Sequence, residues 1–134
     1  MAGLKTILCI EDEHFISELY SRALTKAGYV VTIMLSGQDG LAAAQTDAYD
    51  LILLDLMTPG ITGIEALYSL RDPTKTPKLH SRIIITTNLD QEESMRQELE
   101  KMADGYLIKA EITPKQLVSI VDQMKEQLEN IGEA

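Results

Sequence analysis

The stretch that decides the fold reads Tyr49-Asp50-Leu51-Ile52-Leu53-Leu54-Asp55. Residues 49–54 are nearly all apolar, which is typical of a central strand that is buried on both faces of a parallel sheet. The charged residue Asp55 follows this run directly, so it marks the carboxyl end of the expected strand. A strand that is buried on both faces needs helices above and below it, and the stretch therefore predicts an α/β protein.

Strand and helix patterns alternate along the chain on both sides of this stretch. Strand-like runs cover residues 6–10, 29–35, 49–54, 82–87 and 104–109, and helix-like segments cover 13–26, 36–44, 62–71, 90–102 and a last helix from residue 113. Five βα units in a row predict a single domain over residues 1–134. We expect a flavodoxin-like, doubly wound sheet of five parallel strands in the order 2-1-3-4-5, with helices on both faces.

Three of the expected helices begin with residues that typically cap a helix. Ser36 is a suitable N-cap for the short helix that runs to residue 44. Thr113 and Gln116 form the pattern of a capping box, with a proline between them at the first helical position. Asp90 and Glu93 have the same spacing, so we expect the helix over 90–102 to begin at Asp90.

Composition limits the class of protein to which the chain can belong. Its formal net charge of −9 disfavours direct binding to nucleic acid or to an anionic membrane surface. No apolar stretch is long enough to span a membrane, and the N-terminus has no signal-peptide pattern, so we expect a cytoplasmic protein. The single cysteine, Cys9, lies in an apolar run and is expected in the core, which suits a reducing compartment.

Polar side chains follow four of the five expected strands. The carboxyl ends of parallel strands meet at one edge of the sheet, and ligands of doubly wound sheets bind there, between strands 1 and 3. We therefore expect one shallow cleft to contain Glu11, Asp12, Glu13, Asp55, Thr86, Thr87, Asn88 and Lys109.

These residue types together indicate phosphoryl chemistry. Neighbouring carboxylates repel one another unless a cation joins them, and a few oxygen ligands suit Mg²⁺, with Mn²⁺ as a substitute. A carboxylate beside such a metal can attack phosphorus and form an acyl phosphate. Lys109 and Thr87 are the kinds of group that stabilise the charge on phosphoryl oxygens. The two histidines, His14 and His80, are isolated in the sequence and are expected to be surface groups.

Over essentially its whole length the chain resembles the response-regulator receiver domains, the CheY-like superfamily of two-component phosphorelay systems. Four motifs carry the resemblance in order: Ile10-Glu11-Asp12-Glu13, the segment from Asp50 to Gly60 with Gly63 further on, Thr87, and Asp104-Gly105-Tyr106-Leu107-Ile108-Lys109. The resemblance implies a phosphoacceptor signalling domain, which catalyses only its own phosphorylation and dephosphorylation and is not otherwise an enzyme.

The same resemblance implies a role for each site residue. Asp55 would accept the phosphoryl group from a histidine kinase or a histidine phosphotransfer protein. The ligands of Mg²⁺ would be Asp12, Asp55, Glu11 directly or through water, and the backbone carbonyl of Met57, whose side chain we expect to pack. The phosphoryl-binding and switch residues would be Thr87, Asn88, Lys109 and Tyr106. Lys109 would pair with the phosphoacceptor at rest, and Tyr106 would turn inward as Thr87 moves.

The output surface that the resemblance implies comprises the helix over 90–102, the strand over 104–109 and the last helix. A downstream protein target that the sequence does not identify would bind there. By fold analogy, the same surface would support a homodimer that depends on phosphorylation.

Five positions depart from the family pattern or qualify it. Glu11 replaces the more common aspartate, and Ala110 stands where the family often has a cis proline after the lysine, so we expect a trans bond and a differently shaped loop. Asn88 replaces a small residue and is expected to narrow access to the phosphoacceptor. Met57 and Leu89 occupy the two positions that flank the phosphoryl group in the family. Neither side chain can orient an attacking water, so we predict slow self-dephosphorylation.

Three other functions compete with this interpretation. A pseudo-receiver would have the same fold without being phosphorylated, and Asn88 is the main reason to keep this alternative. A haloacid-dehalogenase-type phosphatase would need a second aspartate at the position of Met57, and its nucleophile would follow the first strand. An FMN carrier would need a glycine- and hydroxyl-rich phosphate loop after the first strand, where this chain has three acidic residues.

Overall fold

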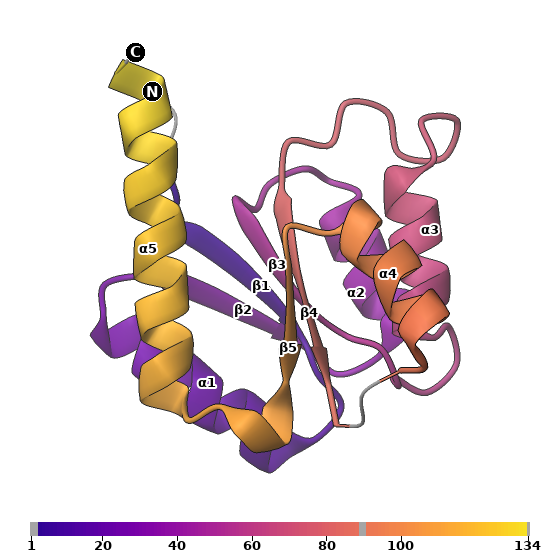
Figure 1. The fold of residues 1–134 in the computed structure, drawn as a ribbon, viewed down its shortest axis with the longest axis horizontal. Coiled ribbons are helices and arrows are strands. Elements are labelled where there is room, and N and C mark those ends of the chain that lie inside the picture. The colour runs from indigo at the N-terminus through magenta and orange to yellow at the C-terminus, as the bar shows by residue number, and fades with distance from the viewer. Residues whose placement is uncertain (1–2, 89–90, 134) are drawn as a thin grey trace.

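Five parallel strands form one sheet in the order β2-β1-β3-β4-β5 (Figure 1). The computed structural model describes residues 3–88 and 91–133. Its strands are β1 Thr6–Ile10, β2 Val30–Met34, β3 Leu51–Asp55, β4 Arg82–Thr87 and β5 Gly105–Ile108. Its helices are α1 His14–Lys26, α2 Gly37–Ala44, α3 Gly63–Arg71, α4 Glu93–Met102 and α5 Pro114–Glu133, with a 3-10 helix η1 at Lys109–Glu111. The predicted fold class and strand order are confirmed.

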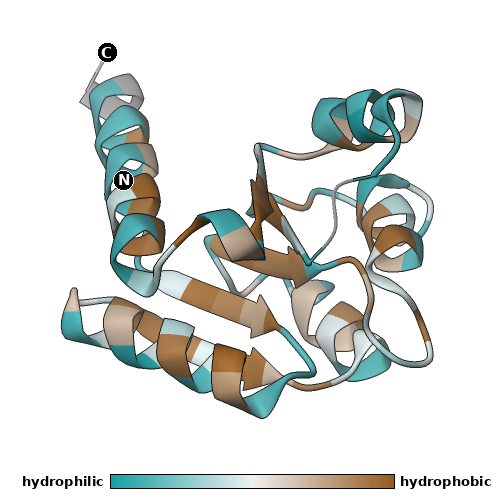
Figure 2. Ribbon diagram, turned by 60° about the horizontal axis from the view of Figure 1, so that its bottom comes forward, coloured by the Kyte–Doolittle hydropathy of each residue, from teal (hydrophilic) through white to brown (hydrophobic). Residues whose placement is uncertain are grey.

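Helices cover both faces of the sheet, with α1 and α5 on one face and α2, α3 and α4 on the other (Figure 1). Successive side chains of a strand point to opposite faces, so Leu51 and Leu53 of β3 pack with α1 and α5, while Ile52 and Leu54 pack with α3 and α4. Figure 2 shows the result as largely hydrophobic strands between helices that carry both hydrophilic and hydrophobic residues. Each buried leucine or isoleucine contributes about 1.5–3 kcal/mol, which makes β3 a firm support for the residue at its end.

Two of the three predicted helix caps are confirmed. The hydroxyl of Ser36 accepts a hydrogen bond from the backbone N–H of Asp39 at 3.1 Å. At the start of α5, the backbone N–H of Gln116 donates to the Thr113 hydroxyl at 3.1 Å, and the N–H of Thr113 donates to Gln116 Oε1 at 2.8 Å. These two bonds form the reciprocal capping box that the sequence predicts.

The predicted start of α4 is wrong. Asp90 lies outside the described residues, and α4 begins at Glu93, with Glu92 as an N-cap that makes no side-chain capping bond. Because Glu93 is the first residue of the helix, it is not at the third helical position, where a capping box needs a glutamate. The backbone N–H of Gln91 donates to the Tyr106 hydroxyl of β5 at 3.2 Å, and Glu92 has a non-helical backbone (φ −59°, ψ 154°), so these residues do not form a first helical turn.

The connection from β5 to α5 is a short 3-10 helix. β5 ends one residue earlier than the pattern predicts, because Lys109 already belongs to η1. No described residue has a cis peptide bond, so the bond between Lys109 and Ala110 is trans, as predicted. Among the described residues, no helix combines the length and the apolar character that a membrane span requires.

Candidate functional site

The ends of β1, β3 and β5 bring the predicted site residues to one edge of the sheet. Ile10 of β1 pairs in register with Leu54 of β3, so the residues that follow them, Glu11 and Asp55, are level with one another. Asp55 itself pairs with Thr86 of β4, and Thr87 pairs with Ile108 of β5. Parallel pairing thus gathers residues from four separate parts of the chain, as the alternating pattern predicts.

Three carboxylates lie together at this edge. Glu11, Asp12 and Asp55 each present an oxygen, and these oxygens lie within 4.8 Å of one another. Glu11 and Asp55 are only 1% and 2% exposed, while Asp12 is half-buried. Burial and the neighbouring Asp55 charge raise the pKa of Glu11 to about 7, although Lys109 opposes this shift. Burial and the contact with Asp55 also raise the pKa of Asp12.

One buried lysine faces the three carboxylates. Lys109 is 7% exposed, its ammonium forms an ion pair with Glu11 Oε1, and it lies 3.4 Å from Asp55 Oδ2. The resemblance implies a pair with Asp55, and Glu11 is the nearer partner in this structure. Burial alone would lower the pKa of Lys109, but the contacts with Glu11 and Asp55 outweigh it and raise the pKa, so the ammonium stays charged.

The donors at this edge fit a divalent cation. One ammonium cannot neutralise three carboxylates, and neither Glu11 Oε1 nor Lys109 Nζ has an aligned hydrogen-bond partner among the described residues, although the two atoms touch as ions. Every candidate ligand is a hard oxygen, which is the donor that Mg²⁺ prefers. Glu11, Asp12 and Asp55 would hold the ion.

The turn after β3 is fixed by the phosphoacceptor candidate itself. Asp55 Oδ1 accepts a hydrogen bond from the backbone N–H of Met57 at 3.1 Å, which is the geometry of an Asx turn. The expectation that the Met57 side chain packs is wrong, because it is 64% exposed. The turn carries the chain outward past the edge of the sheet, where no core remains for that side chain to join.

Gly63, at the first position of α3, packs directly against the end of β3. A Cβ atom on Gly63 would lie 2.0 Å from the backbone oxygen of Asp55, and its N–H donates to the oxygen of Leu56 at 3.0 Å. Only a residue without a side chain allows α3 to begin so close to the site. The sequence shows this glycine within a motif, but the close approach that requires it appears only in the structure.

The rim contributed by β4 shows a contact that the sequence does not predict. Thr87 is fully buried at the end of β4, whereas Asn88 is exposed and its side-chain N–H donates to Glu13 Oε1 at 3.3 Å. The backbone N–H of Glu13 in turn donates to Glu11 Oε2 at 3.2 Å. Asn88 therefore joins the loop after β4 to the loop after β1. That it narrows access to Asp55 stays a prediction, and Leu89 lies outside the described residues.

Tyr106 lies in β5 and is half-buried. Its hydroxyl accepts the Gln91 N–H described above, and the guanidinium carbon of Arg96 lies 4.7 Å from the centre of its ring. The sequence identifies Tyr106 by resemblance and gives no signal for Arg96, because the contact depends on how α4 is rotated about its axis.

Comparisons with known proteins agree with this geometry. Residues 7–122 match the family model described as the response regulator receiver domain. The chain is 38% identical over 103 residues to the transcriptional regulatory protein HprR of Escherichia coli and 39% identical over 103 residues to the response regulator ArlR of Staphylococcus aureus. Each alignment covers 77% of this chain but only 44% and 45% of those proteins, so the chain spans less than half their length.

Solved structures show the same architecture. A CheY-like response regulator receiver domain protein from Methanospirillum hungatei aligns over 96% of this chain and 98% of its own, with a TM-score of 0.77 and 27% identity. The receiver domain of the Francisella response regulator 1452 aligns over 92% of this chain and 98% of its own, with a TM-score of 0.79 and 25% identity.

Proposed function

Since the chain belongs to the response regulator receiver domains of two-component systems, we propose that it accepts a phosphoryl group on Asp55 in a reaction that depends on Mg²⁺. The observation that carries the proposal is the placement of Asp55. It is buried at the end of β3, beside two further carboxylates and within 3.4 Å of the Lys109 ammonium. A buried carboxylate with an adjacent cation and metal ligands is arranged for attack on phosphorus.

The transfer exchanges one bond for another. A carboxylate oxygen of Asp55 forms a bond to phosphorus while the phosphorus–nitrogen bond of a phosphohistidine breaks, and the imidazole keeps that electron pair and takes up a proton. Lys109 would pair with the carboxylate before the transfer and with the phosphoryl oxygens after it. The Thr87 hydroxyl would donate a hydrogen bond to one of these phosphoryl oxygens. Bound Mg²⁺, held by Glu11, Asp12, Asp55 and the carbonyl of Met57, would supply charge neutralisation at this edge.

Phosphorylation would change the state of the domain itself, so the domain works as a switch and turns over no other substrate. Its phosphodonor would be a histidine kinase or a histidine phosphotransfer protein in the cytoplasm. Its output would be a changed surface on α4, β5 and α5, to which a target protein or a second copy of the chain binds. The acidic chain, with its net charge of −9, is unsuited to direct binding of nucleic acid by this domain.

Intact-mass spectrometry tests the proposal. The protein is incubated with acetyl phosphate, which is a small acyl phosphate donor, with either Mg²⁺ or EDTA. We expect a gain of one phosphoryl group with Mg²⁺, no gain with EDTA, and no gain in Asp55→Asn. The matched control is Asp50→Asn, which makes the same change at the other end of β3 and should still be phosphorylated.

Two results would contradict the proposal. A phosphoryl gain that persists in Asp55→Asn would place the acceptor elsewhere. A folded wild-type protein that is phosphorylated neither by acetyl phosphate nor by a phosphohistidine donor would be a pseudo-receiver, which acts by docking alone.

A further inference from the structure

We propose that Arg96 is a positioning residue that clamps Tyr106 beside Gln91, just before α4, so that the tyrosine and α4 move as one unit. The inference rests on the proposed function, because it describes how phosphorylation of Asp55 would reach the output surface. It concerns residues of α4 and its preceding loop to which neither the family motifs nor the site geometry assigns a role.

Two contacts with described residues hold the Tyr106 side chain. Its hydroxyl accepts a hydrogen bond from the Gln91 N–H at 3.2 Å, and the guanidinium of Arg96 lies over its ring at 4.7 Å from the centre. A guanidinium within about 6 Å of a ring centre is attracted by the negative face of the ring. One contact fixes the end of the tyrosine and the other fixes its plane, so together they set the orientation of the side chain.

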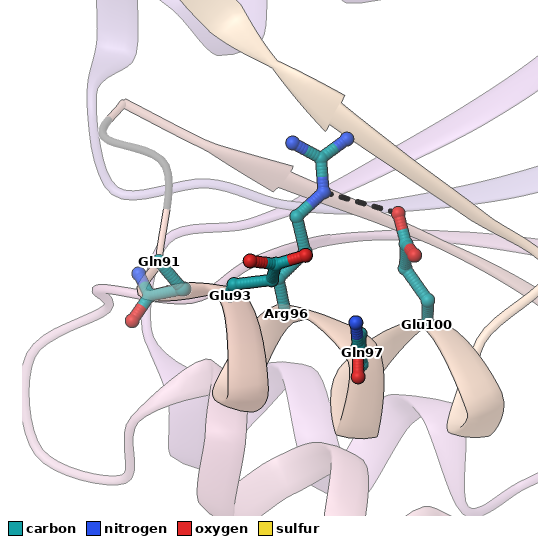
Figure 3. A pocket seen from close by; sticks show the side chains of 5 residues that line it. All are labelled: Gln91, Glu93, Arg96, Gln97 and Glu100. Carbon is teal, nitrogen blue, oxygen red and sulfur yellow. Dashed lines mark hydrogen bonds and ion pairs between the residues drawn. The ribbon is translucent and has the colours of Figure 1, made fainter.

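Arg96 is itself held in place by α4. Its Nε lies 3.1 Å from Glu100 Oε1, one helical turn further along, and its backbone N–H donates to the oxygen of Glu92 at 2.9 Å. Figure 3 shows both side chains rising from the same side of α4, with Gln91 and Glu93 beside them around a hollow on the helix surface. The guanidinium is therefore directed by the helix, and a shift of α4 would carry it along.

Tyr106 links the switch residues to α4. By the family resemblance, the tyrosine turns as Thr87 moves toward a phosphoryl group on Asp55. Because Arg96 of α4 lies over the ring and the Gln91 N–H is bound to the hydroxyl, a turn of the tyrosine would pass to α4.

An ordinary surface arginine would also pair with a glutamate four residues away on a helix, so the ion pair alone does not indicate a clamp. The discriminating contact is the one between Arg96 and the tyrosine ring. Glu100→Gln removes the charge of the pair but leaves the guanidinium over the ring, whereas Arg96→Ala removes both. Arg96→Lys keeps a cation that can reach the ring and should restore the effect in part.

The first experiment observes Tyr106 directly in the full chain. The protein has five tyrosines, so labelling with 3-fluorotyrosine gives five ¹⁹F signals, and Tyr106→Phe identifies the one of interest. We expect Arg96→Ala to shift or broaden this signal alone and to increase the minor orientation of the ring about two- to five-fold, the size expected for a partly exposed cation–ring contact. Arg96→Lys should show a smaller change, and Glu100→Gln the smallest.

The second experiment measures transmission. Hydrogen exchange over residues 93–102 is compared before and after phosphorylation with acetyl phosphate and Mg²⁺, at equal phosphorylation of the wild type and Arg96→Ala. We expect the wild type to change its protection on α4 and the variant to change it less, with the unfolding midpoints of the two proteins alike.

The outcomes separate this inference from the proposed function. If Arg96→Ala leaves the Tyr106 signal unchanged, the clamp does not exist. If that signal changes but α4 responds to phosphorylation as in the wild type, Arg96 does not transmit the movement. If the wild type is never phosphorylated, the proposed function fails, while the ¹⁹F comparison still decides whether Arg96 holds Tyr106.

Discussion

Acidic residues at the two ends of the sheet lie in opposite electrostatic surroundings. At the start of β3, Asp50 accepts hydrogen bonds from the backbone N–H groups of Lys5 at 2.8 Å and Thr6 at 3.0 Å, and from the Thr6 hydroxyl at 3.1 Å. His80 Nε2 lies 3.2 Å from its other oxygen. Burial alone would raise the pKa of Asp50, but these donors outweigh it and hold the pKa below its ordinary value.

At the other end of β3, Asp55 lies among like charges instead. The pKa values of its neighbours Glu11 and Asp12 are raised by burial and by Asp55, so this edge favours protons or a metal ion. The comparison teaches that the fold is stabilised at the amino ends of the strands, whereas the carboxyl ends keep uncompensated charge that a cation and a phosphoryl group can use.

The largest loss of stability should come from a substitution at Gly63, where α3 packs against the backbone of the site. Gly63→Ala would place a Cβ atom 2.0 Å from the Asp55 oxygen, and only a shift of α3 or β3 can relieve that clash. We expect the free energy of unfolding in urea to fall by about 3 kcal/mol, the upper range for overpacked positions, with weaker phosphorylation. Gly3→Ala is the matched control, because a Cβ there meets no atom within 4 Å. Equal stability of the two variants would show that the site tolerates a shift of α3.

Asp50, just before β3, and Asp55, its last residue, should respond to the same substitution with changes in unfolding free energy of opposite sign. Asp50→Asn weakens several hydrogen bonds to a charged group and should lower the free energy of unfolding by about 2 kcal/mol. Asp55→Asn removes one of three crowded charges and should raise it by about 1 kcal/mol in EDTA. Urea unfolding of both variants measures the difference. A loss of stability in both would mean that Lys109 already balances the charge at the carboxyl end.

A smaller effect concerns how long the carboxyl end keeps its phosphoryl group. Met57 is exposed and apolar beside Asp55, and Leu89 is the other residue that we predict to flank the phosphoryl group. Leu89→Gln supplies a group that can orient an attacking water, so we expect the phosphorylated protein to decay about ten-fold faster, which is less than the roughly 10²–10⁴-fold of a full general base because an amide takes up no proton. The decay is followed by intact mass after removal of the donor, and an unchanged rate would contradict the role of Leu89.

The smallest effect is a pH dependence at the amino end. His80 Nδ1 lies 2.6 Å from Asp47 Oδ1, and although burial alone would lower the pKa of His80, its contacts with Asp50 and Asp47 raise it above the ordinary 6.5. Stability from this contact is fully present below pH 6.5 and is lost as the pH rises through the higher pKa of the folded state.

Solvent screening at a side chain that is 53% exposed should keep this contribution below about 1 kcal/mol. The measurement is the difference in unfolding free energy between the wild type and His80→Gln, taken with Mg²⁺ present at pH 5.5 and pH 8.5. We expect the difference to shrink at the higher pH, while His14→Gln shows no such trend. A difference that stays constant with pH would assign His80 a neutral, purely structural role.

The comparison also shows what a sequence can and cannot predict. The fold and the meeting of Glu11, Asp12, Asp55 and Lys109 could be predicted, because alternating strands and helices fix where parallel strands end. The contacts of His80 could not. The sequence predicts a surface group, which the 53% exposed side chain confirms, but it does not predict that His80 reaches Asp47 and Asp50 across 33 and 30 positions of sequence. Contacts between loops depend on loop paths, which leave no periodic pattern in the sequence.

Dependence on loop paths also explains the other differences between the sequence predictions and the structure. The start of α4, the bond between Asn88 and Glu13 and the position of Arg96 all depend on the loop between β4 and α4 or on the rotation of a helix. Capping residues predict a helix start only when the residues that follow them adopt helical backbone angles. Here Glu92 does not (φ −59°, ψ 154°), and α4 begins later than its local pattern indicates.

The most direct test identifies the atom that carries the phosphoryl group. Borohydride reduces an aspartyl phosphate to homoserine and leaves free aspartate unchanged, so peptide sequencing by mass spectrometry after phosphorylation and reduction marks the acceptor. We predict homoserine at position 55 and at no other aspartate, in samples prepared with Mg²⁺ only. Homoserine at another position, or intact Asp55 in protein whose mass shows one phosphoryl group, would contradict the proposal that the carboxyl end of β3 is the acceptor.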